Sequence, residues 1–140
     1  MIALRLNFTD VLREGTLKNV YINGKSSGLQ FDVRLSYYRG IFLSCIDELC
    51  VKVDGEQIPD DAVTFILRGE EYGMADLENL SNVFWPIAEP ATVRVFKDGG
   101  YESGEHRIDL RLMFRSPYIP ISDGIYMPDD GSDSRVMVLN

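Results

Sequence analysis

The side chains of this chain that could do chemistry are few and stand apart. His106 is the only histidine, so a catalytic triad or a histidine-rich metal site would have to be built around it. It follows Gly104-Glu105 at the start of an alternating stretch, where a solvent-facing polar residue is common, and we favour that structural role. The acidic run at 129–133 lacks the alternating ligands and the closing glutamate of an EF-hand loop, and we interpret it as a solvated acidic loop. The residues therefore predict no catalytic group and no metal or other cofactor in this chain.

The best candidate for contact with another molecule is the segment 34–40, Arg-Leu-Ser-Tyr-Tyr-Arg-Gly. On a predicted strand, Tyr37 and Tyr38 place one ring on each face, and Arg34 and Arg39 can stack on a ring or bind a carboxylate. Taken singly, each residue fits a salt-bridged arginine on a solvated face or a tyrosine in the core. As a group they combine residue types enriched at interface hot spots, and the final glycine permits a sharp turn. We interpret the segment as a surface for a partner protein or a ligand.

Trp85 and the two cysteines have simpler interpretations. Trp85 lies between Phe84 and Pro86, and we interpret it as a core residue, with a ligand platform as the alternative. Cys45 and Cys50 are five positions apart, which on one strand places them on opposite faces and disfavours a disulfide. Their spacing matches no metal motif, so both are interpreted as small apolar residues in a reduced compartment.

The elements that must position these residues are short strands. Turn signals such as Asn23-Gly24 and Asp54-Gly55 recur roughly every ten residues, and only 74–80 favours a helix. This pattern predicts an all-β fold, an immunoglobulin-like antiparallel β-sandwich over residues 1–120. Residues 121–140 become acidic before a final apolar stretch, and we interpret them as an irregular C-terminal tail that packs on the domain or on a partner. The expected strands cover residues 2–6, 17–22, 29–37, 43–53, 56–58, 63–67, 82–85, 91–96 and 106–114.

Size and charge limit the classes of function. The chain has 140 residues and a formal net charge of −8, which suits one globular domain and argues against nucleic acid or an anionic membrane surface as a partner. The N-terminus lacks the basic start and apolar run of a signal peptide, and no apolar run approaches the roughly 20 residues that span a bilayer. We expect a cytoplasmic protein.

A set of short landmarks follows in order along the chain. They are Asn23-Gly24, Gly28-Leu29-Gln30-Phe31, Tyr37-Tyr38-Arg39-Gly40, Leu43-Ser44, Val51-Lys52-Val53-Asp54-Gly55-Glu56, Trp85, Glu89-Pro90, Gly99-Gly100, Gly104-Glu105-His106 and Arg115-Ser116-Pro117-Tyr118-Ile119-Pro120. Together these landmarks resemble a known family, the β subunits of the C-glycoside deglycosidases. The resemblance covers residues 17 to 120 approximately.

The resemblance implies a role beside a partner. A larger α subunit, a metal-dependent TIM barrel, would hold a divalent metal, expected to be manganese, and the catalytic base. The complex would cleave the carbon–carbon bond between a 3-keto sugar and an aromatic aglycone, such as a flavonoid or anthraquinone, by elimination. No catalytic residue of the β subunit is implied. The acidic segment after Pro120 has no counterpart in the family pattern.

These observations give a leading hypothesis and an alternative. The first is an auxiliary, non-metal subunit of a carbon–carbon lyase, with the C-glycoside substrate at or near the subunit interface. The second is a stand-alone carbohydrate-binding or protein-interaction module, in which aromatic rings stack on a sugar. For either function, the residues expected to face a partner or substrate are Arg34, Tyr37, Tyr38, Arg39, Trp85 and His106.

Overall fold

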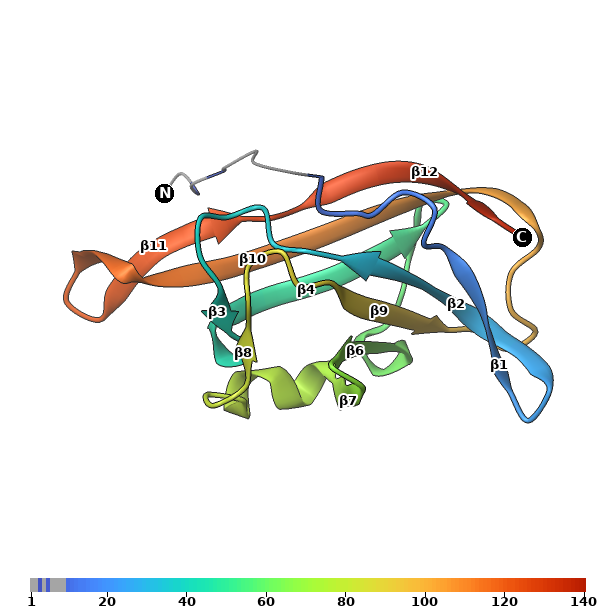
Figure 1. The fold of residues 1–140 in the computed structure, drawn as a ribbon, viewed down its shortest axis with the longest axis horizontal. Helices are drawn as coiled ribbons and strands as arrows, with labels where there is room; N and C mark the ends of the chain where they lie inside the picture. Colours follow the sequence, from blue (N-terminus) through green and yellow to red (C-terminus); the bar gives the residue numbers. More distant parts are fainter. Residues whose placement is uncertain (1–2, 4, 6–9) are drawn as a thin grey trace.

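Two larger antiparallel sheets and one two-stranded sheet, β3-β8, make up the described part of the molecule. The structure, a computed structural model, describes residues 3, 5 and 10–140, with 117–120 as backbone alone. The first sheet has the order β1-β2-β9-β6-β7, and the second has the order β11-β10-β4-β5, with β12 also paired to β10. The predicted all-β sandwich is therefore confirmed (Figure 1). The strands are β1 Lys18–Ile22, β2 Lys25–Val33, β3 Ile41–Phe42, β4 Ile46–Val53, β5 Glu56–Gln57, β6 Val63–Leu67, β7 Glu70–Gly73, β8 Phe84–Trp85, β9 Ala91–Phe96, β10 Gly104–Ser122, β11 Ile125–Asp130 and β12 Asp133–Leu139.

Alternating apolar residues place the core between the two sheets. Phe31 and Phe65 of the first sheet and Phe114 of the second are buried completely or nearly so. Burial of such large apolar side chains is the main favourable contribution to folding. The short pair β3-β8 lies beside the sheets and contributes Trp85, which is also fully buried and packs edge-on against Phe65.

Short helices and tight turns join the strands. Three 3-10 helices interrupt the chain: η1 (Leu43–Cys45), η2 (Asp60–Ala62) and η3 (Met74–Asn79). The predicted turn residues Asn23 and Asp54 adopt positive φ angles of 52° and 51°, each followed by a glycine at positive φ. Two consecutive residues at positive φ are typical of a type I′ hairpin. Both predicted hairpins are thereby confirmed, since they join β1 to β2 and β4 to β5.

The predicted irregular tail is wrong, because residues beyond 120 belong to the second sheet. Strand β10 continues to Ser122 and returns as β11, and β12 then pairs with β10 from Gly104↔Leu139 to Leu110↔Asp133. Met137 and Leu139 are buried, whereas Val136 and Val138 are exposed. Because all four of these residues are apolar, the period of two that marks a half-buried strand is hidden in the sequence.

Other predicted elements differ locally. The expected strand at 29–37 ends at Val33, and the helix predicted at 74–80 is the 3-10 helix η3. Cys45 lies in η1 and Cys50 in β4, and both are free thiols. The strand expected at 2–6 falls largely outside the described residues.

Candidate functional site

The segment 34–40 forms a connection between β2 and β3 rather than a strand. The backbone N–H of Arg34 donates to the carbonyl of Val11 at 3.1 Å, and its Nε donates to the carbonyl of Asp10 at 3.4 Å. From this anchor the chain runs to the end of the molecule at which the β10-β11 hairpin projects (Figure 1). The alternation that suggested a strand is absent from the structure, since Leu35, Ser36 and Tyr37 are all buried.

Tyr37 is the buried member of the tyrosine pair. Its side chain is 2% exposed. The Tyr37 hydroxyl shares a 2.6 Å hydrogen bond with the hydroxyl of Ser116 on β10, and its ring meets Phe114 edge-on at 5.2 Å. Burial raises the pKa of the Tyr37 phenol, so the phenol stays neutral at physiological pH. The ring therefore holds the segment on the second sheet and has no surface for a sugar.

Tyr38 and Arg39 form the exposed part of the segment. Tyr38 is 48% exposed, and its ring centroid lies 4.5 Å from that of Tyr37. The guanidinium carbon of Arg39 lies 5.5 Å from the centre of the Tyr38 ring, within cation–π range. A Cβ atom at Gly40 would lie 2.5 Å from the carbonyl oxygen of Trp85. The glycine is thus required for close approach to β8, which fixes where Tyr38 and Arg39 are presented.

The carboxylate of Asp129 lies beside this cluster. It is 1% exposed, and neither carboxylate oxygen has a hydrogen-bond partner among the described residues. Its strand position opposes Phe114, and its charge would raise the pKa of Tyr37. Burial raises the pKa of Asp129 to about 7. The interpretation of 129–133 as a solvated loop is therefore wrong at this residue. Only the pairing of Asp129 with Phe114 on β10 could have revealed that its side chain is buried.

His106 and Trp85 are held by the fold. His106 is nearly buried, and its two ring nitrogens lie 2.6 Å from the Asp54 carboxylate and 2.6 Å from the Glu102 carbonyl. Burial alone would lower the His106 pKa, but these two acceptors outweigh it, and the net direction is upward. Trp85 donates its indole N–H to the Glu89 carbonyl at 2.8 Å. Both side chains have their polar atoms satisfied internally. The interpretation of Trp85 as a core residue is confirmed, whereas the solvent-facing position favoured for His106 is wrong, because its side chain is buried.

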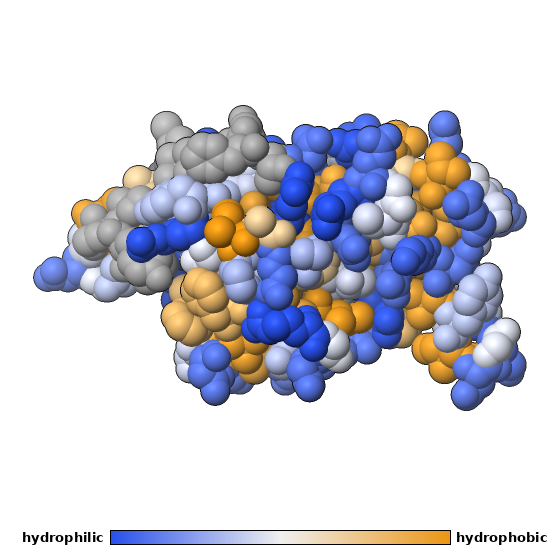
Figure 2. Space-filling view, in the orientation of Figure 1, coloured by the Kyte–Doolittle hydropathy of each residue, from blue (hydrophilic) through white to orange (hydrophobic). Residues whose placement is uncertain are grey.

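Exposed apolar side chains lie close to the segment along the chain. Phe42 and Phe84 come from the paired strands β3 and β8, and their rings meet at 5.1 Å. Each is more than a third exposed, and Ile87 nearby in sequence is 42% exposed. Figure 2 shows apolar atoms over β3 and β8 at this end of the molecule. Grouped apolar exposure of this kind is typical of an interaction surface. Sequence reasoning did not single out these two rings, because Phe84 was assigned to the expected strand 82–85 and Phe42 lay outside the expected strands.

The structure thus brings only some of the predicted residues together. Tyr37, Tyr38 and Arg39 form one cluster with Ser116 and Asp129, whereas the remaining three predicted residues have separate internal contacts. Among the residues that the structure describes, no group of three or more His, Cys, Asp or Glu side chains is placed to hold a metal ion. In the same part of the chain, no helix is long and apolar enough to cross a bilayer.

Comparison with known proteins first gives the class of protein that this chain resembles, namely subunits of multi-subunit enzymes. A family model described as C-glycoside deglycosidase beta subunit matches residues 8–118. A protein of that name from Eubacterium cellulosolvens is 37% identical over 130 residues, which cover 84% of this chain and 88% of the relative. A second, from Arthrobacter globiformis, is 28% identical over 113 residues, with coverages of 80% and 86%.

A third relative carries a more specific name. The 3′-dehydrocarminate deglycosidase beta subunit of a Microbacterium species is 29% identical over 112 residues, covering 80% of this chain and 84% of the relative. Taken with the family match, these likenesses show that the chain belongs to the C-glycoside deglycosidase beta subunit family. The resemblance inferred from the sequence landmarks is confirmed, and the family name makes its members subunits of a larger deglycosidase.

Proposed function

We propose that this chain is the β subunit of a heteromeric C-glycoside deglycosidase that cleaves the carbon–carbon bond between a 3-keto sugar and an aromatic aglycone. The observation that carries the proposal is the family match over residues 8–118. One relative's name specifies a substrate that is oxidised at the 3′ position, which supports a keto sugar as the reacting form. In the proposed complex the partner is a TIM-barrel α subunit.

The oxidised sugar explains how such a bond can break. A ketone at position 3 acidifies the neighbouring C–H, so a base can remove that proton and leave an enolate. The enolate electrons then form a carbon–carbon double bond as the bond to the aglycone breaks, and the aglycone carbon takes up a proton. The described residues of this chain offer no group suited to holding a metal ion. In the proposed complex we expect the divalent metal, with manganese as the expected ion, in the partner.

The role proposed for this chain is to present a preorganised surface to the partner or the substrate. Tyr38 and Arg39 are exposed, and the buried Tyr37–Ser116 pair fixes their backbone. An arginine next to an aromatic ring, beside exposed phenylalanines, has the composition of an interface hot spot.

The carbohydrate-binding alternative loses most of its support in the structure. Of its three candidate stacking rings, Trp85 and Tyr37 are buried, and only Tyr38 is exposed. A single exposed ring is a weak platform, because sugar-binding surfaces need polar partners at fixed positions as well as a ring. Titration of the isolated chain with aromatic C-glycosides, followed by calorimetry, is expected to show no binding.

Co-expression with a candidate TIM-barrel α subunit tests the proposal. We expect the two proteins to co-purify as one complex, and the complex to release aglycone from a 3-keto C-glycoside faster than the barrel alone. Chromatography that separates the two proteins, together with unchanged activity of the barrel alone, would overturn the proposed function.

A further inference from the structure

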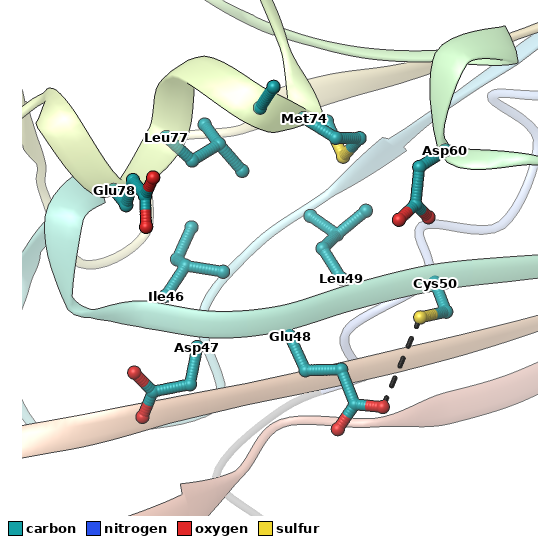
Figure 3. Close-up of a pocket in the computed structure, with 10 residues that line it drawn as sticks. Ile46, Asp47, Glu48, Leu49, Cys50, Asp60, Met74, Leu77 and Glu78 are labelled. Carbon is teal, nitrogen blue, oxygen red and sulfur yellow. Dashed lines mark hydrogen bonds between the residues drawn. The ribbon is translucent and has the colours of Figure 1, made fainter.

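A groove along the side of the sandwich lies away from the cluster described above. It has a volume of about 330 Å³ and runs between β4 and η3 (Figure 3). Figure 3 shows four apolar side chains on its two walls that point toward one another, Ile46 and Leu49 from β4 and Met74 and Leu77 from η3. Sites that accept peptide side chains or small ligands have volumes of roughly 300–1,000 Å³.

The wall formed by β4 is an open sheet edge. Strand β5 has only two residues and pairs with Lys52 and Val53, and no strand of the described chain pairs with this edge between Ile46 and Val51. The carbonyl of Val51 faces the edge, since it accepts a 3.0 Å hydrogen bond from the N–H of Ile58. Along an antiparallel strand, every second residue directs its backbone N–H and C=O to the same side. Leu49, two residues before Val51, therefore presents both groups to the edge that Val51 faces. An uncapped edge of this kind can accept another strand.

The charges in the groove have one sign. The ten residues that line it include no lysine, arginine or histidine. Asp47 and Glu48 are already matched, because they form ion pairs with Arg115 and Arg111 on the far side of β4. Asp60 and Glu78 are exposed, and Figure 3 shows their carboxylates near opposite ends of the groove. Neither appears in an ion pair within the described part of the chain.

We propose that the groove between β4 and η3 docks an extended basic segment of the partner subunit, which adds to the free edge of β4 at Leu49. Apolar side chains of that segment would pack between Leu49 and Met74, and two basic side chains would reach Asp60 and Glu78. Main-chain pairing supplies affinity in this mode of recognition, and the flanking pockets supply specificity. The inference rests on the proposed function, since it adds a second surface by which the chain would join its partner, apart from the one around Tyr38 and Arg39.

Charge reversal with a matched control tests the electrostatic part. The variant Asp60→Lys/Glu78→Lys changes both carboxylates of the groove, and Asp61→Lys/Asp76→Lys makes the same change on η2 and η3 at exposed residues that do not line it. Calorimetric titration with the purified barrel subunit should show at least a tenfold weaker Kd for the groove variant. The control should change Kd less than threefold.

Amide hydrogen exchange tests the pairing itself. In the free chain the Leu49 N–H should exchange quickly, whereas the Cys50 N–H, which faces β10, should be protected. Adding the barrel subunit should slow exchange at Leu49 by at least tenfold and leave Cys50 unchanged. A complex of normal Kd with the groove variant, or one with unaltered exchange at Leu49, would overturn the docking groove alone. If the wild-type chain forms no complex, the proposed function and this inference both fail.

Discussion

The side chain of Asp129 lies in an environment that disfavours its charged form. Its carboxyl group is buried without a hydrogen-bond partner in the described structure. Leaving a buried charge unpaired is costly, and the group responds by holding its proton. The carboxyl group therefore couples the stability of the β10-β11 hairpin, and of Tyr37 beside it, to pH.

We predict that the free energy of unfolding falls as the pH rises from 4 to 7. The folded pKa is about 7, and the unfolded value is about 3.9. Between these values the native state binds a proton that the unfolded chain has released, so stability is lost as pH rises and then levels off. The loss should be on the order of 2–4 kcal/mol, at about 1.4 kcal/mol per pKa unit.

Urea unfolding at several pH values, with wild type and Asp129→Asn side by side, measures this effect. The amide stays neutral in both states, so the variant should lack this fall and be the more stable chain at pH 8. His106, whose pKa is also raised, titrates in both chains and cancels in the comparison. Parallel curves for the two chains would show that Asp129 is ionised in the native state.

The hydroxyl pair of Tyr37 and Ser116 gives a second prediction at this scale. Tyr37→Phe leaves the Ser116 hydroxyl, which is fully buried, without its partner. We expect a loss of about 1–2 kcal/mol in the free energy of unfolding, because a buried polar group then goes unsatisfied. Tyr38→Phe is the matched control, and since Tyr38 is exposed it should change stability by less than about 0.5 kcal/mol. Equal effects in denaturant titrations would contradict the assigned roles.

At the scale of elements, substitutions in β12 measure how much the packing of this strand contributes to the free energy of unfolding. Leu139 is 1% exposed and Val138 is 56% exposed. Leu139→Ala should lower the free energy of unfolding by about 2–4 kcal/mol, as expected for truncating a buried leucine. Val138→Ala should change it by less than about 0.5 kcal/mol. Thermal unfolding followed by circular dichroism measures both, and similar midpoints for the two variants would mean that β12 is a loosely attached tail.

Elements with local signals were predictable from the sequence, and elements defined by distant partners were not. The hairpins at Asn23-Gly24 and Asp54-Gly55 depend on two residues each and were identified correctly. The strand β12 and the burial of Asp129 depend on β10, and no nearby residue indicates that pairing. The segment 34–40 alternates in sequence like a strand but leaves the sheet, since burial of Tyr37 against Ser116 replaces strand pairing. Landmark resemblance supplied the family, which composition and periodicity could not supply.

At the scale of the whole molecule, the exposed end around Arg39 should matter only in the complex. Arg39→Ala should leave the thermal midpoint of the isolated chain unchanged, because its side chain is exposed. In the complex we expect a five- to tenfold loss of either partner affinity or turnover, corresponding to about 1–1.4 kcal/mol. Arg107→Ala, at an exposed arginine near the start of β10, is the control. Normal Kd and normal turnover for Arg39→Ala would make the segment purely structural.

The first described residues of the chain are tied to the last ones. The Leu12 N–H donates to the Asp133 carboxylate at 2.9 Å, and Arg135 forms ion pairs with Asp10 and Glu14. The central strand of the second sheet, β10, pairs along one edge with β11 and β12. During synthesis the N-terminal half emerges long before these contacts exist, so the second sheet is completed only after Leu139 has left the ribosome. The second sheet therefore cannot be completed before β12 has been synthesised, and a chain cut short within β12 would keep an open edge on β10.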